Sequence, residues 1–240
     1  MIHPLVDVAQ RAATEKAVES ARSHTIPLHT RVLTTAPDVQ RYRGSRPHLF
    51  GAPMQQGDIA AEMERARIDF HHLVDNATSS ELRAGTDGTK WTNEQLLFHM
   101  LFGYLLVHNL LILVKGFTGL PRRVSKAFAA ALNAATRPFH VVNYLGSLGG
   151  ARVLGHARME RLMDFVIGRL QRSVIAANED SLNRGMHFPV GWDPYFNDYM
   201  TLRDVYHYAT QHYDHHRRQL TLAATTAEEN HRLPKATGEE

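Results

Sequence analysis

Four of the chain's histidines lie within ten residues of one another near the C-terminus, at positions 207, 212, 215 and 216. If this stretch is helical, His212 and His216 stand four residues apart on one face, with side chains about 6 Å apart. One divalent ion bridges a gap of that size. His207 points to the opposite side of such a helix from His216 and cannot join them. The pair therefore predicts two ligands of a metal site whose third ligand comes from elsewhere.

His99 is the candidate third ligand, because it lies near the start of the most apolar helical stretch of the sequence. An imidazole in an apolar helix costs desolvation free energy unless it finds a partner, and a metal ion is one such partner. Taken alone, a histidine in this position is more commonly a hydrogen-bonded core residue. Taken together, the three residues favour a metal site with His99, His212 and His216 as ligands.

Three neutral histidines leave at least one position open on a metal ion, which is typical of catalytic sites. Water or a thiol bound there has a lowered pKa and becomes a nucleophile near neutral pH. The chain contains no cysteine, which excludes disulfides, thiolate metal ligands and cysteine nucleophiles. Any thiol chemistry must therefore use the thiol of a cosubstrate.

Several polar and aromatic residues surround the expected site, and none of them is assigned a catalytic role. Asp214 or a backbone carbonyl is a candidate for orienting an imidazole. Tyr208 lies one turn before His212 and either reaches a substrate or packs in the core. His215 either faces solvent, caps the helix or supports a ligand, and Glu94 is expected in an exposed first turn rather than as a base. Three aromatic residues either rim the pocket or belong to the core: Trp192, Tyr195 and Phe196.

The charge balance and the N-terminus limit the classes of partner. The net charge is +3 and the pI about 9.3, but no long Lys/Arg run is present, so no nucleic-acid partner is expected. No signal-peptide pattern opens the chain, and a cytoplasmic location is predicted. The 19 residues 96–114 contain no Asp, Glu, Lys or Arg and approach the length of a membrane span. Because histidines and an asparagine interrupt them, they better fit the central helix of a bundle, and no membrane partner is expected.

The chain divides into three parts by composition. Four prolines lie between residues 23 and 57, and this stretch shows little apolar periodicity. Residues 1–57 are therefore predicted to be an N-terminal extension, partly helical or disordered. Residues 58–224 show helical periodicity and are predicted to form a bundle domain. Residues 225–240 are polar and are predicted to be a disordered tail.

Helical periodicity, capping signals and breakers predict helices over 58–76, 92–115, 124–135, 150–179 and 201–222. Asp58 is a plausible N-cap, and the Thr92–Gln95 and Thr201–Asp204 pairs resemble capping boxes. Pro138 is expected to end the third helical stretch, and the aromatic-rich residues 185–200 to form an irregular connection. Four long helices, a long connection and no convincing alternating strand pattern indicate a four-helix bundle, with the second and fourth long helices supplying the histidines.

The segments that carry the histidines resemble the DinB-like family of metal-binding four-helix proteins. Residues 91–99 (WTNEQLLFH) are similar to the family's second-helix segment, which ends in the first metal histidine. Residues 200–204 (MTLRD) lead into residues 212–220 (HYDHHRRQL), which are similar to the segment with the other two. The resemblance covers residues 59–224 and implies an all-α fold, a four-helix bundle of DinB-like type with a long crossover connection.

This family includes thiol-dependent S-transferases and maleylpyruvate isomerase, so the resemblance implies a divalent metal, zinc or nickel, held by His99, His212 and His216. It implies transfer of a low-molecular-weight thiol to an electrophilic small-molecule substrate through a metal-bound thiolate, or a related isomerisation. Arg218 stands where the family commonly has glycine, which adds bulk and charge beside the site. The alternative is a non-catalytic metal-binding bundle acting as an interaction or stress-related protein. Related bundles often pair, so a homodimer is plausible.

Overall fold

The computed structural model describes residues 54–117 and 119–224. The predicted N-terminal extension, apart from residues 54–57, and the predicted tail, residues 225–240, lie outside the described residues. The proposed domain boundaries therefore stay predictions. Within the described part the elements are almost all helical, and the prediction of an all-α protein is confirmed.

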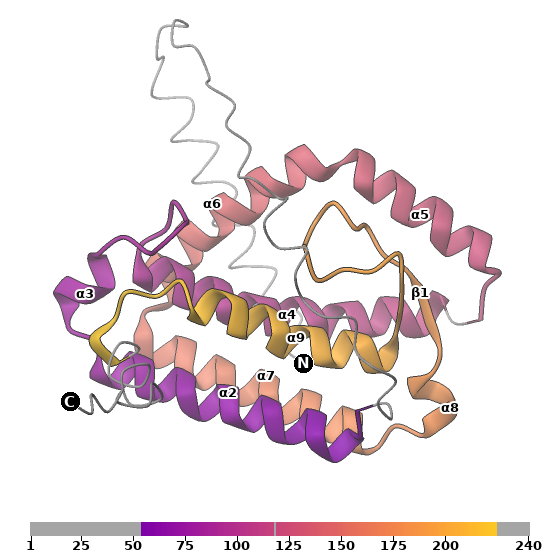
Figure 1. Cartoon of the computed structure of the whole chain (residues 1–240), viewed down its shortest axis with the longest axis horizontal. Helices are drawn as coiled ribbons and strands as arrows, with labels where there is room; N and C mark the ends of the chain where they lie inside the picture. Colours follow the sequence, from indigo (N-terminus) through magenta and orange to yellow (C-terminus); the bar gives the residue numbers. More distant parts are fainter. Residues whose placement is uncertain (1–53, 118, 225–240) are drawn as a thin grey trace, which may run out of the picture.

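Four long helices form the bundle. In Figure 1, α2 and α7 make the lower layer, α4 and α9 lie above them, and α5 and α6 cross on top. Helix α2 packs on α7 and α9, and α4 packs on α7, α9 and α6. The predicted four-helix bundle with a long crossover connection is therefore confirmed. The bundle helices are α2 (Gln56–Asn76), α4 (Asn93–Phe117), α7 (His156–Ile175) and α9 (Leu202–Arg217).

Helix α4 is the central helix of this arrangement. Among the described residues it is the one helix that is long and apolar enough to cross a membrane, by length and composition alone. Its apolar side chains are buried against three other helices, and 56% of its most apolar window lies inside the structure. Core packing thus accounts for the apolar composition of α4, as the sequence indicated.

The crossover contains two helices, α5 (Arg122–Ala134) and α6 (Thr136–Leu154), where the sequence predicted one. Helix α5 ends at Ala134, before Pro138, as predicted. The expectation that Pro138 breaks the chain is wrong, because Pro138 occupies the first turn of α6, where a backbone N–H has no helical partner in any case. The predicted helix over 150–179 is also wrong at both ends. Gly155, with φ of 66°, separates α6 from α7, and α7 already ends at Ile175.

The connection from α7 to α9 contains short elements that the sequence did not predict. Helix α8 (Glu179–Leu182) is followed by strand β1 (Gly185–His187), which pairs antiparallel with β2 (Tyr199–Thr201). Three-residue strands are too short to show an alternating pattern, as is the five-residue helix α3 (Ser79–Arg83). The strand pair holds the two ends of the loop 188–198 together and places this loop beside α9 and below α5 (Figure 1).

Both predicted capping boxes are present in the structure, whereas the predicted N-cap of α2 is not. Thr201 caps α9 and accepts a hydrogen bond from the backbone of Asp204, as predicted. Thr92 and Gln95 form the predicted reciprocal pair at the start of α4. Asp58 is not an N-cap but the third residue of α2, where it accepts a hydrogen bond from the backbone N–H of Gln55. Helix α9 ends at residue 217, five residues before its predicted end at 222.

Candidate metal centre

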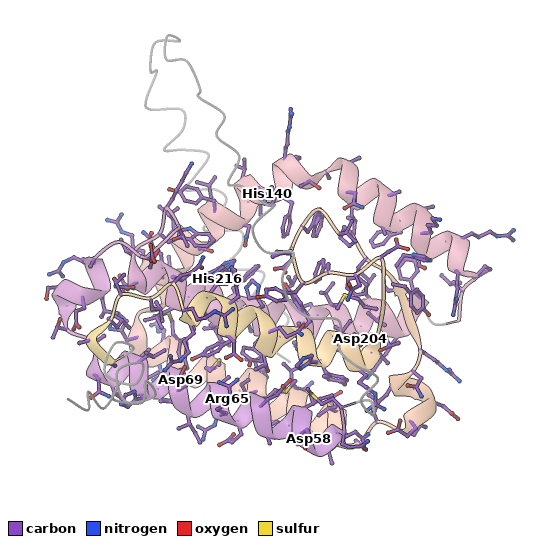
Figure 2. All side chains as sticks on the ribbon, viewed as in Figure 1. Asp58, Arg65, Asp69, His140, Asp204 and His216 are labelled. Atoms are coloured by element: carbon purple, nitrogen blue, oxygen red, sulfur yellow. The ribbon has the colours of Figure 1, made fainter. Side chains whose placement is uncertain are left out.

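The structure brings the three predicted ligands together between α4 and α9. The candidate ligand nitrogens of His99, His212 and His216 lie within 4.8 Å of one another. His99 and His212 are buried, and His216 is half-buried. In Figure 2, His216 lies on the side of α9 that faces α6, whereas Asp69 and Arg65 belong to α2, below α9 in this view. The site is therefore enclosed by the bundle and by its crossover.

Gly103 allows the close approach of α9 to α4 at this point. A Cβ atom on Gly103 would lie 2.6 Å from Cδ2 and 3.2 Å from Nε2 of His212. Real side chains essentially never make contacts that short, so any larger residue would displace the imidazole. Gly103 is thus a packing requirement of the site, placed one helical turn after His99.

Ser147 of α6 fixes the tautomer of His99. The Ser147 hydroxyl donates its single hydrogen to the carbonyl oxygen of Asn143 at 2.9 Å. It lies 3.2 Å from Nδ1 of His99 and must act as the acceptor there, so Nδ1 of His99 carries the proton and donates. The lone pair of His99 is therefore on Nε2.

Asp193, in the loop between β1 and β2, orients the His212 ring by accepting a hydrogen bond from its Nδ1. Nδ1 of His212 lies 3.0 Å from the Asp193 carboxylate, which accepts this hydrogen bond together with those from the Tyr208 hydroxyl and the Tyr195 backbone N–H, each at 2.9 Å. Burial raises the pKa of Asp193, but the hydrogen bond from His212 and the other donors outweigh it, and the pKa lies below its usual value. A carboxylate that orients an imidazole in this way is typical of metal sites.

Gln219 completes the pattern by accepting from Nδ1 of His216 at 2.7 Å. All three imidazoles thus donate from Nδ1 and keep the lone pair on Nε2. Among the described residues, three buried side-chain polar atoms have no hydrogen-bond partner. Two of these, Nε2 of His212 and Nε1 of Trp91, belong to residues that line the same cavity. A buried orphan nitrogen is costly unless a ligand completes it.

The surroundings of His99 and His216 favour their neutral forms. Burial, and then the neighbouring rings of His212 and His216, hold the pKa of His99 well below its usual value. Burial and the proximity of His212 lower the pKa of His216 to about 3. Burial and the nearby His212 also lower the pKa of His215, which is not part of the triad. Neutral imidazoles are the form that binds metal, so the lowered pKa values of His99 and His216 and the orphaned Nε2 of His212 fit a divalent transition metal.

A cavity of about 180 Å³ opens onto the three histidines. Helices α4, α6 and α9 and the loop 188–198 form its walls. The predicted rim residues Trp192, Tyr195 and Phe196 all line it, although Phe196 is also buried in the core. The Trp192 ring stacks on Phe139 of α6 with centroids 3.8 Å apart and donates from Nε1 to the Leu132 carbonyl at 2.9 Å. The cavity therefore has preformed aromatic walls.

Other predicted neighbours of the site have different roles. Asp214, the predicted orienting residue, instead forms an ion pair with Arg65 at 2.8 Å, because its position on α9 faces α2. Glu94 is partly exposed and pairs with His156 at 2.9 Å, as expected for a first-turn residue. Tyr208 is buried in the core and also lines the cavity, and its hydroxyl donates a hydrogen bond to Asp193.

His215 lines the cavity, with Nδ1 3.3 Å from the Tyr195 hydroxyl. Ser147, Asp193 and Gln219 were not predicted from the sequence. Only Gln219, three residues after His216 and thus within reach of its ring, had a signal in the local spacing.

The chain belongs to the DinB superfamily, because the family's model matches residues 62–220. Among solved structures it is similar to YfiT from Bacillus subtilis, described as a probable metal-dependent hydrolase with an unusual four-helix bundle topology. The TM-score is 0.51 at 13% identity, covering 77% of this chain and 93% of that one, so the likeness concerns the fold alone. A comparison with curated proteins gives no match.

Proposed function

We propose that this member of the DinB superfamily is a divalent-metal-dependent enzyme whose ion is held by Nε2 of His99, His212 and His216. The observation that supports this most strongly is the shared hydrogen-bond pattern, in which every Nδ1 is bound to a protein acceptor while every Nε2 is left for a ligand. Core histidines have no need of three converging lone pairs, and the orphaned Nε2 of His212 is costly without a ligand.

The chain's own residues orient the donors. Ser147, Asp193 and Gln219 each hold one imidazole in the tautomer that presents Nε2. Asp193 also stabilises the site electrostatically, because its carboxylate supplies negative charge beside three neutral ligands and a dication. Zinc and nickel both accept imidazole nitrogen, and either metal fits this donor set.

The proposed reaction is transfer of a low-molecular-weight thiol to an electrophilic small molecule, as the family resemblance implies. A divalent ion in this site would lower the pKa of a thiol or water ligand and so supply a nucleophile near neutral pH. The cavity beside the three histidines supports a reacting molecule rather than a closed structural site, which has no room for one. A cytoplasmic location and a homodimer accompany this proposal as untested expectations.

Hydrolysis is the second candidate, because YfiT is described as a probable metal-dependent hydrolase. Both reactions use the same donors and differ only in the nucleophile, a thiol in one and water in the other. The remaining alternative is a non-catalytic bundle that holds the metal for stability and acts through a partner. Product formation and its dependence on added thiol separate these three possibilities.

The test combines metal content with turnover. Wild type, His99→Ala and the control His156→Ala are purified without a tag, checked for helicity, and analysed for bound metal. We expect about one equivalent of one transition metal in wild type and in His156→Ala, and none in His99→Ala. No metal in folded wild type after incubation with zinc and nickel would refute the proposal.

The loaded protein is then mixed with an electrophile in the presence and absence of cysteine, glutathione or another small thiol, and products are identified by mass spectrometry. A thioether product that needs both thiol and metal supports S-transfer. A hydrolysed product that forms without thiol supports the hydrolase. Bound metal with no product in either mixture supports the non-catalytic bundle.

A further inference from the structure

We infer that the cavity above the three histidines binds an uncharged, apolar, ring-containing molecule. This inference rests on the proposed function, since it names the class of substrate that would reach the metal. The observations are the charges that line the cavity, the bonds already made by its one carboxylate, and the geometry of its aromatic walls.

Among the residues that the structure describes, no lysine or arginine lines the cavity, and Asp193 is its one Asp or Glu. An anionic substrate that enters would lose water and find no protein cation in return, which is costly. The cavity is instead lined mainly by apolar and aromatic side chains, including Trp91, Phe102, Leu106, Phe139, Trp192 and Phe196. Burial of an apolar ring against such walls is favourable by about 25 cal/mol per Å².

The nearby arginines of α9 do not change this charge balance. Arg217 binds Asp69 of α2 through two hydrogen bonds of 2.8 Å, on the far side of α9 from the cavity. Arg218 is exposed and is not among the residues that line the cavity. Both positive charges therefore remain outside.

Binding of a cationic substrate in this cavity is also unfavourable. The Asp193 carboxylate already accepts from His212, Tyr208 and the Tyr195 backbone N–H. A metal dication held by three neutral histidines would add positive charge to the same cavity and repel a second cation. The same dication attracts an anion, but the neighbouring Asp193 carboxylate offsets part of its charge, and the described walls away from the metal offer an anion no protein cation. A neutral ring requires neither partner.

The walls favour a planar group. The nearly parallel Phe139 and Trp192 rings, at 9° to each other, present a fixed stack because the Trp192 indole is hydrogen-bonded to Leu132. The Trp91 ring lies 4.4 Å from the His99 ring and forms a second aromatic surface. Flat aromatic surfaces prefer offset-stacked or edge contacts with another ring. Asn143 and the Tyr195–His215 pair are the polar groups available to orient a substituent.

The test compares two probes of nearly the same shape, nitrobenzene and benzoate, by calorimetric titration of zinc-loaded protein. Benzoate is also able to bind zinc, so a preference for nitrobenzene is a stringent result. We expect nitrobenzene to bind at least about tenfold more tightly, because the cavity walls offer the benzoate carboxylate no protein cation in exchange for its water. Equal or tighter binding of benzoate, or no binding of nitrobenzene at millimolar concentration, would overturn the inference.

Two matched variants test the cause. Asn143→Lys places a cation in the cavity wall and should raise benzoate affinity about tenfold, whereas Asn109→Lys adds the same charge on α4 outside this cavity and should change nothing. An equal effect of the two variants would show that long-range charge, not the lining, sets the preference and would overturn the inference.

Zinc content is measured in the same samples. Failure to load zinc, with nitrobenzene still bound, refutes the metal enzyme but not the neutral cavity. If zinc is loaded but benzoate binds more tightly than nitrobenzene, the neutral cavity is refuted and the metal enzyme is not.

Discussion

Two groups of histidines in this bundle are built in opposite ways. On the outer face of α2 and α7, both ring nitrogens of His71 contact carboxylates, Nδ1 with Glu160 at 3.2 Å and Nε2 with Asp164 at 2.7 Å. Burial lowers the pKa of His71, but the bonds to Asp164 and Glu160 outweigh it and raise the pKa above its usual value. Between α4 and α9, only one nitrogen of each site imidazole is bound to the protein.

The difference distinguishes a histidine that is bound on both ring nitrogens from one that could serve as a metal ligand. His71 is satisfied as a charged residue in an ion-pair network and has no lone pair to offer. In the triad, His99 and His212 are buried, and each keeps Nε2 for a ligand. The number of bound ring nitrogens, not the density of histidines, therefore separates the two roles.

The largest contrast is expected from removing one histidine of each kind. His216→Ala should weaken zinc binding more than about 100-fold, because two ligands rarely hold a catalytic metal, whereas His71→Ala should leave it unchanged. The measurement is the rise in Tm on adding zinc, which follows metal affinity. A zinc-dependent rise in His216→Ala as large as in wild type would contradict the assignment.

Asp193→Asn should have the next largest effect. The amide keeps the size of the side chain but loses the charge that orients His212, so metal affinity should fall about 10- to 100-fold with little change in helicity. Asp198→Asn is the control, since Asp198 is exposed and pairs with His187 on β1 at 3.2 Å. Competition with a metal chelator gives both affinities, and equal values in the two variants would remove Asp193 from the site.

Gly103→Ala should act through packing. Its Cβ would displace His212, which we expect to cost about 1–3 kcal/mol of unfolding free energy and to weaken metal binding. Gly116→Ala on the same helix is the control, because a Cβ there meets nothing within 4 Å. Denaturant unfolding of both metal-free variants gives the comparison. If the two variants have the same stability and metal affinity, α9 does not need the close approach.

The smallest expected effect is the opposite pH dependence of the two groups in metal-free protein. Lowered pKa values at His99 and His216 mean that the folded state binds fewer protons, so this stability is present above about pH 6.5. It is lost as the pH falls toward the folded pKa, about 3 for His216. The raised pKa of His71 gives stability below about pH 6.5 that is lost as the pH rises through the folded value.

Unfolding free energies of wild type, His216→Ala and His71→Gln at about pH 5 and pH 8 test these signs. His216→Ala should lose less stability than wild type on acidification, and His71→Gln should differ from wild type more at the lower pH. Equal changes in unfolding free energy between the two pH values in all three proteins would show that the surroundings shift the pKa of neither group.

The sequence was sufficient to predict that the three candidate ligands lie together, but not to predict the residues that orient them. His99, His212 and His216 could be found because helical spacing and the apolar surroundings of His99 restrict where their side chains lie. Asp193 and Ser147 could not, because their contacts join residues 19 and 48 positions apart and depend on the loop 188–198 and on α6.

The fold shows the same limit. The four bundle helices follow from apolar periodicity, and Thr92 and Thr201 mark two of their starts. Helix α6 was missed because Pro138 and several glycines look like breakers, although a proline in a first turn interrupts nothing. The sequence therefore did not predict the cavity wall that α6 forms.

The most direct test of the account is a crystal structure of the zinc-loaded protein with anomalous data at the zinc edge. The account predicts one strong peak about 2.1 Å from Nε2 of His99, His212 and His216, with each Nδ1 still bound to Ser147, Asp193 and Gln219. A peak at the carboxylate-rich cluster around His71, or zinc bound through an Nδ1 atom, would contradict it.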